Sequence, residues 1–241
     1  MNTDKLVAHR GDNTHFPENS YAALESALKA GARYIEFDVQ MIADGTLIVF
    51  HDADLIRLVG NNTSIFNLNN SDLNSMSVHF PSKFSEKFNP TYIPTLQTVL
   101  SILEKYPNSH AFVEIKQGSI SHWGLNKVMN ALLNVLKPYS KQVYIISFSD
   151  EALEYTHANS NIKTGLVFDF LNNNTKEIAK QLNPDYLICP YDAIGKKTLW
   201  KGDWQWMVYS LNDSSLVKEA FNRKDINLVE TDNIQLMLSQ N

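Results

Sequence analysis

The sequence contains very little cysteine, because Cys189 is the one thiol in 241 residues. A single cysteine excludes an intramolecular disulfide and a metal cluster held by cysteines. No apolar run approaches the length of a membrane-spanning helix, so we expect no stable membrane anchor. Basic residues number 21 against 26 acidic ones, and no basic run is long enough to follow a phosphate backbone. Nucleic acid is therefore not an expected partner.

The sequence also leaves little room for a targeting segment or a second domain. Its first residues, MNTDKLVAHRG, enter an expected strand by Leu6, so we expect no signal peptide. We predict a cytoplasmic protein, and the alternative is a trimmed secreted form. With 44% hydrophobic residues, a chain of this length can bury one large core. No repeat, linker or low-complexity tract divides it, so residues 1–241 are expected to form a single domain.

Strand-like and helix-like segments alternate along nearly the whole chain, which is typical of a parallel sheet with helices outside it. Helices are expected at 21–31, 95–106, about 122–137, 150–159, 174–182 and 214–223. Parallel strands are expected at 6–10, from 34, and at 111–116, 143–148, 163–168, 186–190, 206–212 and 226–232. Eight such strands predict an α/β fold, the (β/α)8 TIM barrel.

The stretch from Tyr34 to Asp52 carries the most unusual polar pattern in the sequence. In its first strand, Glu36 and Asp38 alternate with apolar residues, so both carboxylates point to the same face. Two carboxylates this close would repel each other, and each would raise the pKa of the other. A hard cation such as Mg²⁺ or Ca²⁺, which takes oxygen ligands, would relieve the repulsion. The alternative is a salt-bridged, solvated face of the sheet.

A turn signal at Asp44-Gly45 follows, and after it a second strand, TLIVFHD. If this turn is a two-residue hairpin, its register puts His51 directly opposite Asp38, on the same face of the sheet. The imidazole would then lie beside the carboxylate pair. The alternative is a crossover to a parallel strand, in which His51 still lies at a strand end, where barrel enzymes keep their chemistry.

Residues 53–93 interrupt the alternation of strands and helices. This segment is rich in Asn and Ser, with scattered Ile, Leu, Met and Phe, and is too long and too aromatic for a plain loop. We predict a small inserted lobe with short helices that lies over one end of the barrel. The alternative is a mobile surface loop.

Unusual polar residues gather at or near the carboxyl ends of the expected strands, which form the catalytic rim of a barrel. They are His9, Arg10, Glu36, Asp38, His51, Glu114 and Lys116. Three carboxylates can hold a divalent cation, two histidines can act as general acid and base, and Arg and Lys can bind an anion. The set suits metal-assisted displacement at phosphorus. The alternative is a collection of internal ion pairs and core histidines.

Several short motifs resemble those of one enzyme family, the glycerophosphodiester phosphodiesterases. The chain reads AHRG, PENS, IEFDV and VFHD in its first part, then L-x-R at 55–57, IPTL at 93–96, EIK at 114–116, SF at 147–148 and TD at 231–232. The resemblance runs nearly the whole length, and the short cytoplasmic bacterial members are the most similar in form. It implies a TIM barrel with a small insertion after the HD motif, in agreement with the lobe expected at 53–93.

The resemblance also implies roles for individual residues. One divalent cation, Mg²⁺ or Ca²⁺, would be held by Glu36, Asp38 and Glu114, and the acid/base pair would be His9 and His51. The phosphate would be contacted by Arg10 and Lys116. The substrate pocket would be bordered by Phe148, Tyr209 and Asn212. The chain departs from the family pattern near its carboxyl terminus. It reads YSLN at 209–212 in place of W-T-V-N, and NLVETDNI in place of a Gly-rich strand, TD and Pro. These changes border the pocket for the alcohol or glycerol part of the substrate.

The implied reaction is hydrolysis of a small glycerophosphodiester to sn-glycerol 3-phosphate and an alcohol, by a monomer or homodimer. Either a glycerol hydroxyl attacks phosphorus first, giving a cyclic phosphate that water opens, or water attacks directly. We keep two alternative functions. One is a phospholipase D acting on lysophospholipids or sphingomyelin, and the other is a non-catalytic barrel that binds phosphoesters.

Overall fold

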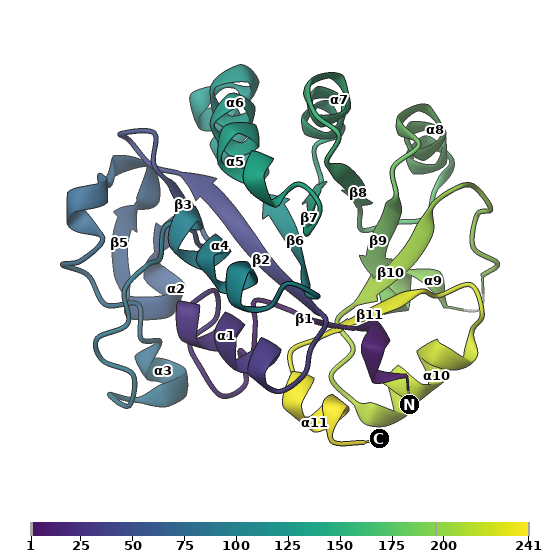
Figure 1. Cartoon of the computed structure of the whole chain (residues 1–241), viewed down its shortest axis with the longest axis horizontal. Helices are drawn as coiled ribbons and strands as arrows, with labels where there is room; N and C mark the ends of the chain where they lie inside the picture. Colours follow the sequence, from purple (N-terminus) through teal and green to yellow (C-terminus); the bar gives the residue numbers. More distant parts are fainter. Residues whose placement is uncertain (1, 196, 241) are drawn as a thin grey trace.

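The computed structural model describes residues 2–195 and 197–240. Its centre is a closed ring of parallel strands, in which β1 pairs with β2 on one side and with β11 on the other (Figure 1). The ring is made of β1 (Leu6–Ala8), β2 (Tyr34–Met41), β6 (His110–Ile115), β7 (Val143–Ser147), β8 (Lys163–Val167), β9 (Tyr186–Pro190), β10 (Gln205–Tyr209) and β11 (Leu228–Thr231). The predicted (β/α)8 barrel is confirmed.

Helices surround this ring on its outside, with α6, α7 and α8 along one side and α1, α10 and α11 along the other (Figure 1). They are α1 (Tyr21–Lys29), α4 (Leu96–Lys105), α5 (Gln117–Trp123), α6 (Leu125–Leu136), α7 (Asp150–Asn159), α8 (Asn173–Leu182), α9 (Tyr191–Ile194), α10 (Ser214–Asn222) and α11 (Ile234–Leu238). Five of these helices have an N-cap residue whose side chain accepts a hydrogen bond from a backbone N–H of the first turn. These residues are Ser20, Thr95, Ser149, Asn172 and Asp213. None of the helices among the described residues is long and apolar enough to cross a membrane.

The single helix expected at about 122–137 is wrong, because two helices, α5 and α6, occupy this part of the chain. Gly124 separates them with a φ of 85°, a left-handed value that glycine adopts without strain. Helix α5 begins earlier than expected because it covers the end of β2. The backbone N–H of Met41 donates to Ser119 Oγ at 2.9 Å, and Trp123 Nε1 donates to the carbonyl of Met41 at 2.9 Å.

The interior of the ring is filled by a buried layer of large side chains, which is two residues deep on β9. It consists of Val7, Phe112, Ile146, Val167, Tyr186, Ile188, Met207 and Leu228. Successive side chains of a strand alternate between the two faces, so the residue two positions further on also points inward. On β6 this residue is Glu114, after Phe112, and on β11 it is Glu230, after Leu228. The polar groups at the carboxyl ends of the strands therefore stand directly on an apolar layer.

The turn at Asp44-Gly45 forms the predicted hairpin, but its predicted register is wrong. Strand β3 (Leu47–Val49) pairs antiparallel with β2 so that Val49 lies opposite Val39, and Phe50 N donates to Asp38 O at 2.9 Å. The turn has three residues rather than two, since Ile42 N donates to Thr46 O at 3.0 Å. Phe50, and not His51, is therefore the neighbour of Asp38.

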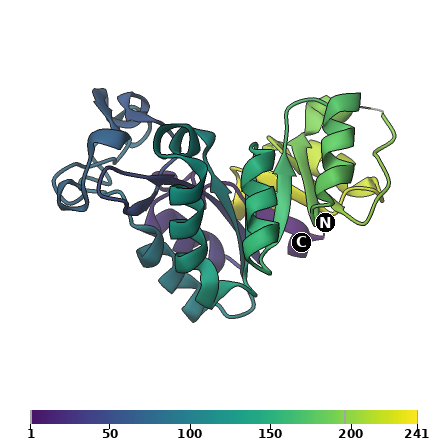
Figure 2. The same ribbon diagram turned by 90° about the horizontal axis from the view of Figure 1, so that it is seen from above.

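The segment at 53–93 forms a small lobe at one edge of the barrel, beside β2 and β3 (Figures 1 and 2). It contains β4 (Asp54–Leu55), α2 (Ile56–Val59), β5 (Asn61–Ser64), η2 (Ile65–Asn67), η3 (Asn70–Asp72) and α3 (Pro81–Phe84). The lobe has its own hydrophobic cluster, which includes Leu55, Leu58, Ile65, Leu68 and Leu73. Ile42, Ile48 and Phe50 of the hairpin complete this cluster, so the extended β2–β3 hairpin carries the lobe. Its small two-stranded sheet was not predicted.

We predict that the barrel folds without the lobe. Because Val49 N donates to Pro94 O at 2.9 Å, the chain enters and leaves the lobe at neighbouring places, and a short Gly-Ser linker can replace residues 54–91. The shortened protein should keep a cooperative thermal transition and the circular dichroism of an α/β protein. Ile48→Thr in the shortened chain limits aggregation, because Ile48 loses its cover there. If the shortened protein lost the cooperative transition both with and without Ile48→Thr, the barrel would need the lobe to fold.

Candidate active site

A cavity of about 250 Å³ opens among the carboxyl ends of the barrel strands. Its lining contains six of the seven polar residues predicted for the site: His9, Arg10, Glu36, His51, Glu114 and Lys116. Phe148 and Tyr209 of the predicted substrate pocket also line it, together with Ser210 and Glu230. The remaining wall is apolar and consists of Ile146, Val167 and Ile188. One side of the cavity is therefore charged and the other is aliphatic.

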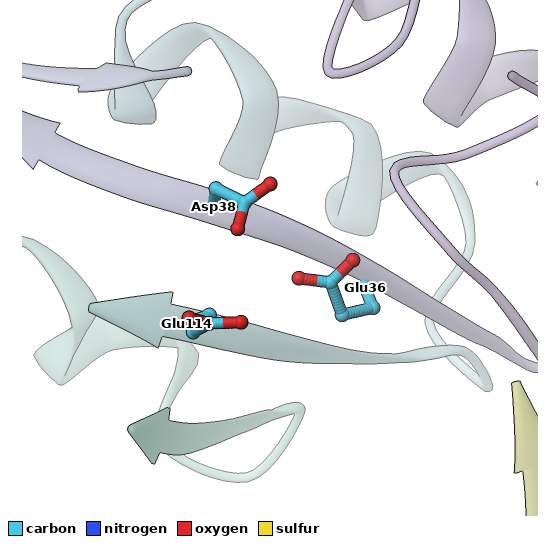
Figure 3. A group of neighbouring side chains, drawn as sticks. All are labelled: Glu36, Asp38 and Glu114. Carbon is cyan, nitrogen blue, oxygen red and sulfur yellow. The ribbon is translucent and has the colours of Figure 1, made fainter. Parts of the chain in front are cut away.

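The three predicted metal-binding carboxylates lie together at the charged side of the cavity. Glu36 and Asp38 come from β2 and Glu114 from the neighbouring β6, and their carboxyl groups turn toward one another (Figure 3). One oxygen of each lies within 4.8 Å of the others. The β2–β6 register explains the grouping, because it places Asp38 directly beside Glu114. Oxygen ligands in this number suit a hard divalent cation.

The electrostatics of the carboxylates fit a cation site. Burial raises the pKa of Glu36 well above its usual range, with Asp38 and Glu230 as further causes. Burial and then Asp38 raise the pKa of Glu114 as well. Burial opposes the ionisation of Asp38 too, but Arg10 and Lys116 outweigh it and hold its pKa below the usual range. Among the described residues Glu36 Oε1 has no hydrogen-bond partner, which leaves a buried carboxyl oxygen free for an ion.

Arg10 and Lys116 bring positive charge to the same carboxylates. Lys116 Nζ lies 2.6 Å from Glu114 Oε1 and 3.3 Å from Asp38 Oδ1. Arg10 Nε lies 3.1 Å from Asp38 Oδ2, and the backbone N–H of Arg10 donates to Glu36 Oε2 at 3.0 Å. Arg10 has a φ of 54°, a left-handed value that is uncommon for arginine and is held here by these contacts.

His9 is fixed in the cavity by a carboxylate from the other end of the chain. Its Nδ1 lies 2.7 Å from Asp232 Oδ1, and Asn13 Nδ2 donates to the same oxygen at 2.6 Å. Burial alone would lower the pKa of His9, but Glu230, Asp232 and Glu36 outweigh it and raise this pKa to about 10. Asn212, predicted to border the pocket, instead donates to Asp232 Oδ2 at 2.6 Å and lies behind His9.

His51 is held in the same manner from the side of the lobe. Its Nδ1 lies 2.7 Å from Asp52 Oδ1, and Arg57 Nε donates to Asp52 Oδ2 at 2.7 Å. Arg57 also forms a bidentate ion pair with Glu18, in which Nη1 and Nη2 donate to the two carboxylate oxygens at 2.8 and 2.7 Å. Glu18 in turn accepts from Arg10 Nη1 at 2.8 Å. A continuous chain of charge-assisted hydrogen bonds thus joins the lobe, His51 and Arg10.

Four charged residues that support the site were not singled out from the sequence as site residues. They are Glu18, Asp52, Arg57 and Asp232. Each belongs to a short motif already noted in the chain: PENS, VFHD, L-x-R and TD. The signal was therefore present, but no sequence argument states which histidine each carboxylate would reach.

We expect Asp232→Asn to lower the pKa of His9, because the substitution removes a negative charge 2.7 Å from the ring while keeping the side-chain shape. NMR titration of the His9 ring protons in the metal-free protein measures this. Asp225→Asn is the matched control, since Asp225 pairs with Arg223 on the surface. An unchanged His9 pKa in Asp232→Asn would contradict the assigned pair.

A family model described as the glycerophosphoryl diester phosphodiesterase family matches residues 9–198. The chain therefore belongs to this family. A glycerophosphodiester phosphodiesterase of Caldanaerobacter subterraneus is 31% identical over 166 residues, which are 68% of this chain and 66% of that protein. A second one, from Bacillus subtilis, is 34% identical over 162 residues, 63% of this chain and 54% of that protein. The matches cover less than two thirds of these curated relatives.

Solved structures of similar fold cover nearly the whole chain. A phosphodiesterase of Oleispira antarctica in complex with the product sn-glycerol-3-phosphate has a TM-score of 0.85 at 22% identity, over 98% of this chain and 95% of that one. A glycerophosphodiester phosphodiesterase of Thermotoga maritima has a TM-score of 0.76 at 24% identity, over 98% of both chains. At these identities the likeness establishes the TIM-barrel fold.

Proposed function

We propose that this protein hydrolyses small glycerophosphodiesters to sn-glycerol 3-phosphate and an alcohol, with the help of one divalent cation. The observation that carries the proposal is the composition of the cavity. Two histidines, each with Nδ1 on a carboxylate, line it together with Glu36, Glu114 and two cationic side chains. Asp38 completes the carboxylate cluster beside these two glutamates. Membership of the phosphodiesterase family supports the same reaction, as does the product named for the Oleispira antarctica structure.

The phosphoryl group would be bound at the charged side of the cavity. Glu36, Asp38 and Glu114 would hold Mg²⁺ or Ca²⁺, which when bound would draw charge from the phosphoryl oxygens and promote attack on phosphorus. Arg10 and Lys116 line the cavity and would bind the remaining phosphoryl oxygens. Both cationic side chains already contact carboxylates of the site, so they are held in place before the substrate arrives.

The two histidines would transfer the protons of the reaction. The attacking hydroxyl must lose a proton and the departing alkoxide must gain one, on opposite sides of phosphorus. We assign the acid to His9, because Asp232 pairs with it directly and Glu230 shares its cavity wall. We assign the base to His51, whose Nδ1 is held by Asp52, a carboxylate that is shared with Arg57.

Chelation tests the cation. EDTA should abolish the hydrolysis of glycerophosphocholine and glycerophosphoethanolamine, and adding back Mg²⁺, Ca²⁺ or Mn²⁺ should restore it. Glu114→Gln should weaken cation binding in calorimetry, because one of the three ligand charges is removed. Glu104→Gln, a change of an exposed glutamate on α4, is the control. Full activity after exhaustive chelation would contradict the assignment of a metal site.

Leaving-group dependence tests the division of labour between the histidines. His51→Ala should slow all substrates by about 10²–10⁴-fold, as expected for loss of a general base. His9→Ala should slow choline and ethanolamine esters to a similar degree but spare p-nitrophenyl esters, whose leaving group departs without a proton. Comparison of kcat/KM on both substrate classes measures this. The reverse pattern would exchange the two roles, and retained activity of either variant on natural substrates would refute the site.

Phospholipase D activity is the second candidate function. A mouse lysophospholipase D is 28% identical over 118 residues, which are 47% of this chain and 34% of that protein. Two large apolar side chains, Phe148 of this cavity and Phe170 of the hollow next to it, are exposed and would offer contacts for a lipid chain. A panel that includes lysophosphatidylcholine beside the glycerophosphodiesters separates the two functions. The cytoplasmic location, the single-domain organisation and the monomeric or dimeric state remain predictions.

A further inference from the structure

Glu230 is a buried acidic residue to which the proposed reaction gives no direct role. It lies on β11, two residues after Leu228, so its side chain points into the barrel just above the apolar layer. Its neighbour in register on β1 is Val7, and only 5% of Glu230 is exposed. Branched apolar residues usually fill the interior layers of a TIM barrel, so a carboxylate at this level needs an explanation.

No group among the described residues satisfies this carboxylate completely. Glu230 Oε1 is buried and has no hydrogen-bond partner in the part of the chain that the structure describes. The nearby cationic groups are engaged elsewhere, Arg10 with Glu18 and Asp38, and His9 Nδ1 with Asp232. Burial raises the pKa of Glu230 to about 7, which reflects the cost of keeping a charge here. An unpaired buried carboxyl oxygen destabilises a fold unless a ligand or water completes its hydrogen bonds.

The rest of the cavity defines the kind of ligand group that can do so. A phosphoryl group would be repelled by Glu230 and attracted to Arg10 and Lys116, so a different part of the substrate must face this carboxylate. The aliphatic wall of Ile146, Val167 and Ile188 lies in the same cavity and suits carbon–hydrogen surface. A ligand fragment with hydroxyl groups on a short carbon chain meets both demands. An ammonium group fits less well, because three cationic side chains, including His9, already line the cavity.

We propose that Glu230 accepts a hydrogen bond from a hydroxyl of the glycerol moiety and thereby selects polyol phosphodiesters over simple alkyl phosphodiesters. A site that hydrogen-bonds a substrate hydroxyl rejects the analogue without it, because the buried acceptor is then left unpaired. This inference rests on the proposed function, since it names the part of the same substrate that Glu230 contacts. Glu230 lies in the NLVETDNI stretch, where the chain departs from the family pattern.

Binding of two product-like ligands tests the proposal without turnover. Calorimetry compares sn-glycerol 3-phosphate with propyl phosphate, which has the same carbon chain without hydroxyls, in the presence of Mg²⁺. The wild type should prefer glycerol 3-phosphate, and Glu230→Leu should reduce this preference by about 10- to 100-fold, the effect of one hydrogen bond to a charged acceptor. Glu230→Gln keeps a carbonyl acceptor and should lose less. Glu154→Gln, on the exposed face of α7, should keep the preference.

Thermal stability gives a second readout that separates a binding role from a structural one. Glu230→Leu removes an unpaired buried carboxylate and extends the apolar layer, so its Tm should rise. A fall in Tm would identify a structural role and contradict the proposal. An unchanged ligand preference in Glu230→Leu would also contradict the proposal. An equal loss of affinity for both ligands would contradict it too, because it would indicate that Glu230 supports His9 or the cation site.

The outcome for this inference can be separated from that for the proposed function. If the wild type hydrolyses glycerophosphodiesters but Glu230→Leu keeps the ligand preference, the inference on Glu230 fails alone. If the wild type hydrolyses none of them, the proposed function fails, and the inference fails with it.

Discussion

The parallel pairing of β2 with β6 is the interaction on which the site depends. Main-chain hydrogen bonds set a register in which Asp38 lies beside Glu114, and Glu36 lies one layer below on the same face. Three buried carboxylates would not assemble by themselves, because they repel one another and lose their hydration. The barrel forces them together, and Arg10 and Lys116 offset part of the cost. A register shift of one residue would turn the carboxylates of one strand away from the cavity.

The same constraint explains how the rest of the site is built. Because the strands deliver fixed charges, the histidines need only be held at the rim, and each is held by one carboxylate on Nδ1. His9 receives its carboxylate from the last strand of the barrel, so ring closure between β1 and β11 is required for the pair. His51 receives its carboxylate from the next residue, and Arg57 of the lobe fixes that carboxylate from behind. The lobe thus supports the site through Arg57, which also pairs with Glu18 of the loop before α1.

Much of this architecture could be predicted from the sequence, because the alternation of apolar runs with amphipathic helices specifies a barrel. The polar site residues could be predicted because they follow those runs at the strand ends. The position of His51 relative to Asp38 could not, since a turn of three residues instead of two moves every cross-strand partner by one. The break of the helix at Gly124 depends on how α5 docks on the end of β2, which is a tertiary effect.

The contacts missed by the sequence argument are long-range ones. His9 and Asp232 are 223 positions apart, and no local pattern indicates that they meet. Glu230 cannot be recognised from the sequence, because one acidic residue in an apolar strand carries no distinctive spacing. Its significance depends on the closed barrel, which buries it in the wall of the same cavity as His9. Local patterns thus predict the elements and their ends, whereas closure of the ring decides which side chains act together.

Isotope labelling most directly tests the proposed displacement at phosphorus with release of glycerol 3-phosphate. Glycerophosphocholine is hydrolysed by the wild-type protein in ¹⁸O-enriched water with a divalent cation, and the products are followed by ³¹P NMR and mass spectrometry. The account predicts that ¹⁸O enters the phosphate of sn-glycerol 3-phosphate and that choline is released unlabelled. Label in choline, or phosphocholine as the phosphorylated product, would contradict it.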